Sequence, residues 1–331
     1  MNTKTNTLLI CLSLAVMIGF LASLSVGPVG IGTWAVLSSI FSDGSDIAVI
    51  IAQEIRLPRA LLGAAIGATL GICGAAMQGY VRNPLAEPGL IGVSASAALG
   101  AVLTIYFGLS TLYVWTLPLG GMIGASVGVM IMVIIAGRGS STLTLILAGV
   151  AVSTLAGALT SLALNLAPNP FAAVEIIFWL LGSLANRSME HVWLAGPFML
   201  IGIALLLTVG KSLDALSLGE DTASTLGVNV RRVRMQIIVG VTVSVGAATA
   251  VAGAIGFVGL VVPHLLRPLV GHRPGILLPA SALGGAILLL FSDVAVRMLS
   301  FGPELKLGVF TALVGSPFFL WLVLKMRSQF I

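Results

Sequence analysis

The stretch Ala60–Tyr80 reads ALLGAAIGATLGICGAAMQGY and contains no charged residue. A helix needs roughly 20 mostly apolar residues to cross the hydrocarbon core of a bilayer, and this stretch has that length. Its apolar residues run continuously, whereas the strands of a membrane β-barrel alternate apolar and polar residues. The stretch therefore predicts a transmembrane α-helix.

The composition extends this prediction to the whole chain. Of its 331 residues, 58% are hydrophobic and 8% are charged, whereas a soluble domain carries roughly a quarter charged residues. The basic residues stand singly between apolar runs, so the net charge of +5 indicates membrane orientation rather than nucleic-acid binding. We predict an all-α, polytopic membrane helical bundle that forms one domain over residues 1–331.

Further apolar runs predict about ten transmembrane helices. The first run is longer than the apolar core of a signal peptide and many spans follow it, so we expect it to be retained. The eighth run is short and contains Pro263, so we expect it to be broken or tilted. The ten expected spans are Leu8–Val26, Ala60–Tyr80, Ile91–Phe107, Val114–Ile135, Leu143–Leu164, Val192–Val209, Ile237–Ala254, Gly256–Val270, Ile276–Leu299 and Leu307–Leu324.

The distribution of Lys and Arg predicts that both termini are cytoplasmic. With the N-terminus inside, the inner loops and ends hold eleven basic residues and the outer loops hold five, as the positive-inside rule requires. The inner set is Lys4, Arg82, Arg138, Lys211, Arg231, Arg232, Arg234, Arg267, Arg273, Lys325 and Arg327. The outer set is Arg56, Arg59, Arg187, Arg297 and Lys306.

Four loops are long or distinctive. Gly27–Arg59 is an expected outer loop with room for a short helix, and Arg82–Gly89 is a proline-rich inner turn. Ala167–His191 is an outer loop whose segment Phe171–Leu181 is expected to lie on the membrane surface. Lys211–Arg234 is the longest inner polar segment.

The segment Lys211–Arg234 contains a capping-box pattern, Ser217-Leu218-Gly219-Glu220. After it, Ala223 and Leu226 are expected on one side of a short amphipathic helix within Thr222–Val230. A helix at the inner face would transmit motion from a soluble partner, and a solvated loop is the alternative interpretation.

Small residues recur at helical spacing in three of the expected spans. Gly63, Gly67 and Gly71 are four apart, as are Gly120, Gly124 and Gly128, which predicts close helix packing. The span Leu143–Leu164 carries a weakly polar stripe made of Gly149, Ser153, Gly157, Thr160 and Ser161. This stripe indicates either the lining of a substrate path or hydrogen bonding between helices.

Charged residues near membrane depth are costly and usually have a reason. Asp293 and Arg297 are four apart, so they can form an ion pair on one helix face. The alternative is a basic outer patch that meets acidic groups on a docking partner.

Signals for catalysis or metal binding are weak. Gly210-Lys211-Ser212 resembles the end of a phosphate-binding loop, but Leu205 stands where the motif needs its first glycine. The three histidines, His191, His264 and His272, lack the spacing of metal ligands. We therefore expect no catalytic residue, metal or cofactor in this chain.

Several segments together resemble one family, the iron-chelate and vitamin B12 permeases of bacterial ABC importers. The similarity covers nearly the whole chain in the family's order. The matching segments are Arg56–Arg59 (RLPR), Gln78, Asn83–Gly89 (NPLAEPG) with Gly92-Val93, Leu218–Glu220 with Leu226-Gly227, Gly256–His264 (GFVGLVVPH) with Arg267, and Gly308-Val309 through Gly315–Phe318 (GSPF).

This resemblance implies a multi-pass protein of the bacterial inner membrane that works as a homodimer or beside a similar permease. Two ATP-binding cassette subunits would bind and hydrolyse ATP below it, so the chain itself would be no enzyme. A periplasmic substrate-binding protein would deliver cargo from above. The expected cargo is a ferric siderophore, with vitamin B12 or haem as the alternative.

The resemblance also assigns roles to residues of this sequence. Docking of the binding protein falls on Arg56, Arg59 and Arg297. Coupling to the ATPase falls within residues 212–230, on Leu213, Leu218, Gly219, Glu220, Thr225, Leu226 and Gly227. The translocation pathway and cytoplasmic mouth are expected at Asn83, Pro84, Leu85, Thr142, Ser153, Gly157 and Thr160.

Two other classes of membrane protein are alternatives. A secondary transporter driven by an ion gradient would need carboxylates or histidines at mid-membrane, whereas Glu87, Glu175 and Asp293 lie near expected loop edges. An exporter or a structural membrane subunit is the second alternative. The absence of a nucleotide-binding motif disfavours an exporter whose permease is fused to its ATPase.

Overall fold

The computed structural model describes residues 3–27, 29–42, 46–137, 141–299 and 304–327, and within these ranges all regular structure is helical. Arg138, one of the inner basic residues, lies outside these ranges. The helices are α1 (Thr3–Ser25), α2 (Thr33–Ile40), α3 (Ile47–Ile50), α4 (Leu57–Val81), α5 (Val93–Tyr106), α6 (Thr116–Ala136), α7 (Thr142–Asn165), α8 (Pro170–Leu180), α9 (Met189–Thr208), α10 (Gly210–Leu216), α11 (Glu220–Thr225), α12 (Val230–Ala252), α13 (Val258–Leu266), α14 (Pro274–Leu299) and α15 (Leu307–Arg327). Short helical turns are η1 (Ile51–Arg56), η2 (Pro88–Ile91), η3 (Leu109–Thr111) and η4 (Pro268–Val270).

Eight of the described helices are long and apolar enough to cross a membrane. They coincide with eight of the ten predicted spans. The other two predicted spans also form helices, but α5 has 14 residues and α13 has 9. At 1.5 Å per residue these helices reach about 21 Å and 14 Å, less than the roughly 30 Å of a hydrocarbon core. The number ten therefore stays a prediction, while an all-helical, multi-pass membrane fold is confirmed.

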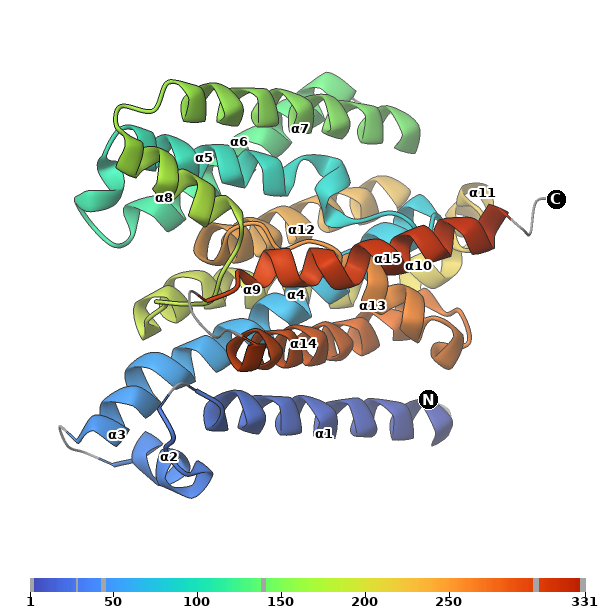
Figure 1. Cartoon of the computed structure of the whole chain (residues 1–331). Coiled ribbons are helices and arrows are strands. Elements are labelled where there is room, and N and C mark those ends of the chain that lie inside the picture. The colour runs from blue at the N-terminus through green and yellow to red at the C-terminus, as the bar shows by residue number, and fades with distance from the viewer. Residues whose placement is uncertain (1–2, 28, 43–45, 138–140, 300–303, 328–331) are drawn as a thin grey trace.

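The long helices lie side by side in a bundle (Figure 1). Most residues of α4 and α12 are buried, whereas fewer than a third are buried in the apolar stretches of α1, α6, α7, α9 and α15. The start of α1 and the end of α15 lie toward the same end of the bundle as α11 (Figure 1). We call this the α11 end, and the other the Arg59 end.

Glycines let the central helices touch through their backbones. A Cβ on Gly67 would overlap the carbonyl of Gly285 in α14, and one on Gly71 would overlap the carbonyl of Ser281. Between α5 and α6, a Cβ on Gly124 would overlap the carbonyl of Ser96. The predicted role of these small-residue stripes in close packing is thus confirmed.

The expected outer loop Gly27–Arg59 is more helical than the sequence indicated. It contains α2, and from Ile47 the chain runs as one continuous helix through α3, η1 and α4 to Val81, over 35 residues. η1 is a π-helical turn just before Pro58, a residue with no N–H to donate. Arg56 and Arg59 therefore lie on a helix.

Candidate functional site

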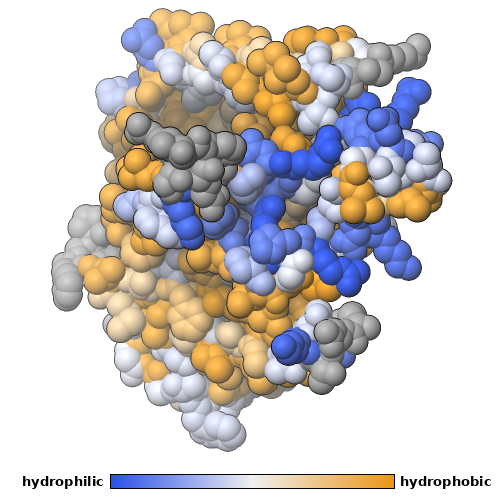
Figure 2. Space-filling view, turned by 90° about the vertical axis from the view of Figure 1, so that its right-hand side faces the viewer, coloured by the Kyte–Doolittle hydropathy of each residue, from blue (hydrophilic) through white to orange (hydrophobic). Residues whose placement is uncertain are grey.

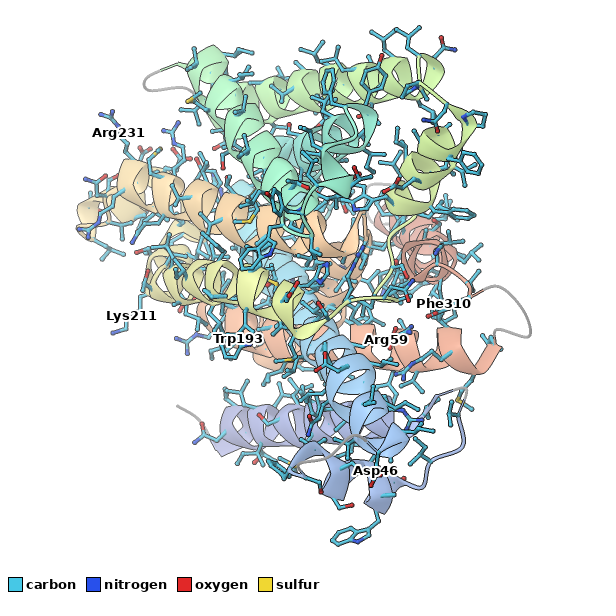
Figure 3. All side chains as sticks on the ribbon, turned by 90° about the vertical axis from the view of Figure 1, so that its left-hand side faces the viewer. Asp46, Arg59, Trp193, Lys211, Arg231 and Phe310 are labelled. Carbon is cyan, nitrogen blue, oxygen red and sulfur yellow. The ribbon has the colours of Figure 1, made fainter. Side chains whose placement is uncertain are left out.

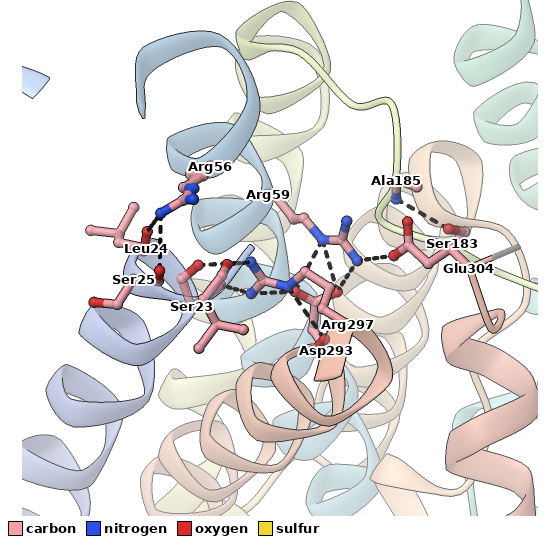
Figure 4. A network of polar contacts seen from close by, with 11 residues as sticks. Ser23, Leu24, Ser25, Arg56, Arg59, Ser183, Ala185, Asp293, Arg297 and Glu304 are labelled. Carbon is pink, nitrogen blue, oxygen red and sulfur yellow. Dashed lines mark hydrogen bonds and ion pairs between the residues drawn. The ribbon is translucent and has the colours of Figure 1, made fainter. Parts of the chain in front are cut away.

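A largely buried cluster of two arginines and two carboxylates surrounds Arg59 (labelled in Figure 3) and is drawn from close by in Figure 4. Arg59 donates from Nε and Nη2 to the Asp293 carboxylate at 2.7–3.0 Å, and it also pairs with Glu304. Arg297 lies 2.9 Å from the second oxygen of Asp293. The predicted Asp293–Arg297 ion pair is confirmed, and the cluster as a whole is charge-balanced.

The arginines also anchor the end of α1. Arg56 donates to the carbonyls of Leu24 and Ser25 at 2.9 and 3.0 Å, which are among the carbonyls that a helix C-terminus leaves unpaired. Arg297 donates to the carbonyl of Ser23 at 2.9 Å. These bonds tie α1 to η1 and α14.

The three arginines do not form an exposed patch in this structure. Arg56 is 3% exposed and Arg59 is 9% exposed, and the Arg297 side chain is 6% exposed. Of the two interpretations of these charges, the structure shows the local ion pair, and docking of a partner at these arginines stays a prediction. The sequence could not show this burial, because the acceptors for these guanidinium groups come from segments remote in the chain.

The proline-rich inner turn follows the end of α4, which packs against α13. Asn83 accepts a hydrogen bond from the Leu85 N–H at 2.9 Å, which fixes the turn just after Arg82 ends α4 in a left-handed conformation. Gln78 donates to the carbonyls of Gly259 and Leu260 at 3.3 and 3.4 Å and accepts from Arg267. The structure thus brings together Gln78 and Arg267, two residues that carried the family resemblance.

Burial shifts the pKa of two charged groups that lie outside the membrane spans. Burial raises the pKa of the Glu87 carboxyl in the inner turn. Burial likewise lowers the pKa of Arg187 in the loop before α9. Neither residue is among the predicted site residues.

The stripe on α7 divides into two parts. Gly149 and Ser153 face the inner turn: a Cβ on Gly149 would overlap the carbonyl of Leu90, and the Ser153 hydroxyl donates to the Gly89 carbonyl at 3.4 Å. Gly157 is exposed, and a Cβ built there would meet no described atom within 4 Å beyond its own helix backbone. Thr160 donates to Ala156 in its own helix, and Thr142 is half-buried at the start of α7.

The predicted coupling segment forms two short helices at the α11 end. Leu213 is fully buried in α10, whereas Leu218 and Leu226 are 65% and 63% exposed on either side of α11. Glu220 and Thr225, the first and last residues of α11, are also exposed. The two leucines thus extend from a segment of mostly polar residues at this end.

The capping box predicted before α11 is wrong. The Ser217 hydroxyl donates to the Asp214 carbonyl at 2.6 Å in the preceding turn, and Gly219, with φ of 111°, precedes α11 instead. Gly227, with φ of 84°, follows the helix. Two residues in conformations that favour glycine therefore delimit α11. Ala223 is buried while Leu226 is exposed, so they do not share a side.

The helices break between α12 and α13, where the predicted spans Ile237–Ala254 and Gly256–Val270 meet. Residues 253–257 between α12 and α13 are not helical, and Phe257 has a φ of 67°, which is rare for an aromatic residue. Ala254 lines a cavity of about 470 Å³ with Leu181, Gly308 and Ser316. Non-helical backbone at membrane depth is tolerated where it is buried in protein or lines a cavity. Gly253 and Gly256 are the residues in the sequence that signal this break.

These features define a multi-pass membrane permease. The FecCD transport family model matches residues 15–325. The chain belongs to this family, whose members are permease subunits of ABC transporters.

Relatives of known name are similar over most of the chain. The Fe(3+)-citrate import system permease YfmD of Bacillus subtilis is 38% identical over 308 residues, covering 92% of this chain and 91% of that relative. The hemin transport permease HmuU of Yersinia pestis is 39% identical, covering 83% and 84%. The vitamin B12 import permease BtuC of Shigella boydii is 37% identical, covering 96% and 95%.

A solved structure has the same fold. Described as an inward-facing conformation of a metal-chelate type ABC transporter, it superposes with a TM-score of 0.86 at 32% identity, over 97% of this chain and 99% of that one.

Proposed function

We propose that this chain is the permease subunit that moves a ferric chelate across the inner membrane of a bacterium, with both termini in the cytoplasm. Import of vitamin B12 or haem by the same machinery is the second candidate, because relatives of similar identity carry those names. The permease works as a homodimer or with a similar chain. Separate ATPase subunits bind and hydrolyse ATP, and a periplasmic binding protein supplies the cargo.

The observation that supports this proposal most is the exposure of Leu218 and Leu226 on either side of α11, in a chain of this family. We call these two residues and α11 the α11 surface. α11 presents Leu218 and Leu226 to a partner, and Leu213 anchors the preceding helix α10 in the core. α10 in turn packs against α14 and α4. Closure of the ATPase subunits would push on α11. This movement would be passed to the central helices and would change the side of the membrane to which the central path opens.

The first prediction concerns this surface. Leu226→Asp is expected to weaken ATPase binding by about 30-fold, since a central apolar contact in an interface contributes about 2 kcal/mol. Affinity purification of the permease with its ATPase, together with ATP-driven uptake, measures the effect. Leu112→Asp is the matched control, because Leu112 is also an exposed leucine but lies in the loop before α6 at the Arg59 end. Equal ATPase recovery in both variants would refute the assignment of α11.

The pathway assignment makes a second prediction. Gly157→Leu is expected to leave stability unchanged within about 0.5 kcal/mol, since the new side chain enters open space. If α7 lines the path with Gly157, Ser153, Thr160 and Thr142, uptake falls while ATPase binding persists. Thermal unfolding and uptake are measured on the same preparation. Unchanged uptake by a stable variant would remove Gly157 from the pathway.

Docking of the binding protein is proposed at the Arg59 end, with Arg56, Arg59 and Arg297 as the residues that attract acidic groups. Glu304 has a side chain that is 31% exposed and it pairs with Arg59. A partner carboxylate would have to replace Glu304 to reach that arginine. The inner turn with Asn83, Pro84 and Leu85 is proposed as the cytoplasmic mouth.

A further inference from the structure

A cavity of about 520 Å³ opens at the α11 end, between the start of α1, η4 and the start of α14. Figure 2 shows this end of the bundle, where hydrophilic side chains gather beside broad hydrophobic surfaces. The cavity is separate from the α11 surface and from the cavity beside Ala254, because no lining residue is shared.

The lining of this cavity has two chemically different parts. Lys4 and Arg273 supply positive charge, and Thr5 adds a hydroxyl. Leu269, Val270 and Ile276 supply an apolar wall. Among the described lining residues two are cations and none is acidic, so the cavity favours an anion that carries an apolar part.

The backbone holds Arg273 at the rim. Gly271 and His272 have φ values of 63° and 60°, and the His272 N–H donates to the Arg267 carbonyl at 3.0 Å. This tight turn reverses the chain after η4 and leads directly into α14. Arg273 is therefore positioned by a defined turn next to the membrane-spanning helix.

The guanidinium of Arg273 keeps capacity for a ligand. Its side chain is 66% exposed, and its ion pair with Asp214 is long, at 3.6 Å. The Asp214 carboxylate is already engaged at 2.7 Å by the N–H of Gly275 at the start of α14. One distant contact leaves most of the five N–H donors of an arginine available.

We propose that this cavity binds the headgroup of an anionic phospholipid from the leaflet at the α11 end. The phosphate lies between Lys4 and Arg273, and the acyl chains follow the apolar wall toward α1. Basic pockets between membrane helices hold anionic headgroups in this way. The helix α1 contacts mainly α14 and exposes most of its length, so the lipid fastens α1 to the bundle. This proposal goes beyond transport and requires only that the bundle lies in a membrane.

The test uses the full chain in nanodiscs of phosphatidylcholine, titrated with phosphatidylglycerol, with thermal unfolding and native mass spectrometry as readouts. We expect phosphatidylglycerol to raise the unfolding temperature and to remain bound to the wild-type chain after release from the nanodisc. In the double variant Lys4→Gln with Arg273→Gln, affinity is expected to fall about 30-fold, because each cation near an anionic lipid contributes about 1 kcal/mol. The control is Arg231→Gln with Arg232→Gln, which removes two exposed cations outside the cavity.

Each outcome decides the proposal. Equal retention of phosphatidylglycerol by both double variants would overturn it, as would equal stabilisation of the wild type by inorganic phosphate, which would indicate an anion site without a lipid. Unfolding temperatures in pure phosphatidylcholine show whether the variants fold. If the double variant is unstable there, Lys4→Gln alone is measured, and unaltered lipid affinity in that variant contradicts the proposal equally.

Discussion

Asp293→Ala is expected to destabilise the protein by about 3–5 kcal/mol, the usual cost of removing one partner from a buried ion pair. Asp293 is 1% exposed and accepts from both Arg59 and Arg297. Without it, Arg59 is left to pair with Glu304, and the buried Arg297 guanidinium loses this carboxylate partner. Thermal unfolding of purified protein in detergent measures the loss, which should appear as a much lower unfolding temperature.

Glu304→Gln is the matched control for this variant. Glu304 also pairs with Arg59, but its side chain is 31% exposed, so water can solvate what remains. We expect a loss of about 1 kcal/mol or less. An Asp293→Ala protein as stable as the Glu304→Gln protein would show that the cluster contributes little to the fold.

Gly71→Leu is expected to cost about 3 kcal/mol, at the upper end of the range for overpacking. The new side chain would be directed at the backbone carbonyl of Ser281, which cannot rotate away as a side chain can. α4 and α14 would separate along their closest contact, and we expect poor membrane yield and early unfolding. Gly157→Leu introduces the same side chain into open space, so similar unfolding temperatures for the two variants would contradict the packing account.

The sequence was sufficient to predict what depends on local composition. Long apolar runs predicted the eight confirmed membrane helices among ten expected spans, and glycine spacing predicted that α4 packs closely against a neighbour that it did not name. The Asp293–Arg297 pair followed from a spacing of four on a helix. These features were predictable because each is determined by neighbours in the chain.

Features that depend on remote segments were not predictable in the same way. The sequence did not show that carbonyls of α1 and the carboxylates of Asp293 and Glu304 cover Arg56, Arg59 and Arg297 in this conformation. The cap of α11 was assigned to Ser217 because the pattern fits, whereas Ser217 ends the preceding helix and Gly219 makes the turn. Whether Ser217 caps the helix that follows it or ends the helix that precedes it therefore depends on how this segment packs in the folded chain.

The break at residues 253–257 shows a further limit. The predicted spans place a boundary at residue 255, but the break or tilt expected at Pro263 does not form, because that proline is accommodated within α13. Gly253 faces the carbonyl of Trp179 there, and Gly308 faces Ala254 and Leu181. Three segments meet through glycines, a contact that no single stretch of sequence reveals.

The central claim, that this chain is the permease of an ATP-driven importer for a ferric chelate or a related cargo, is tested most directly by uptake. Radiolabelled ferric chelates, haem and vitamin B12 are offered to cells that lack the chain, with and without the chain restored. Each assay is repeated with a protonophore and, separately, with ATP depleted. The account predicts that one cargo is lost, returns on complementation, survives the protonophore and stops without ATP. Unchanged uptake of every cargo, or uptake that stops with the protonophore while ATP remains, would contradict it.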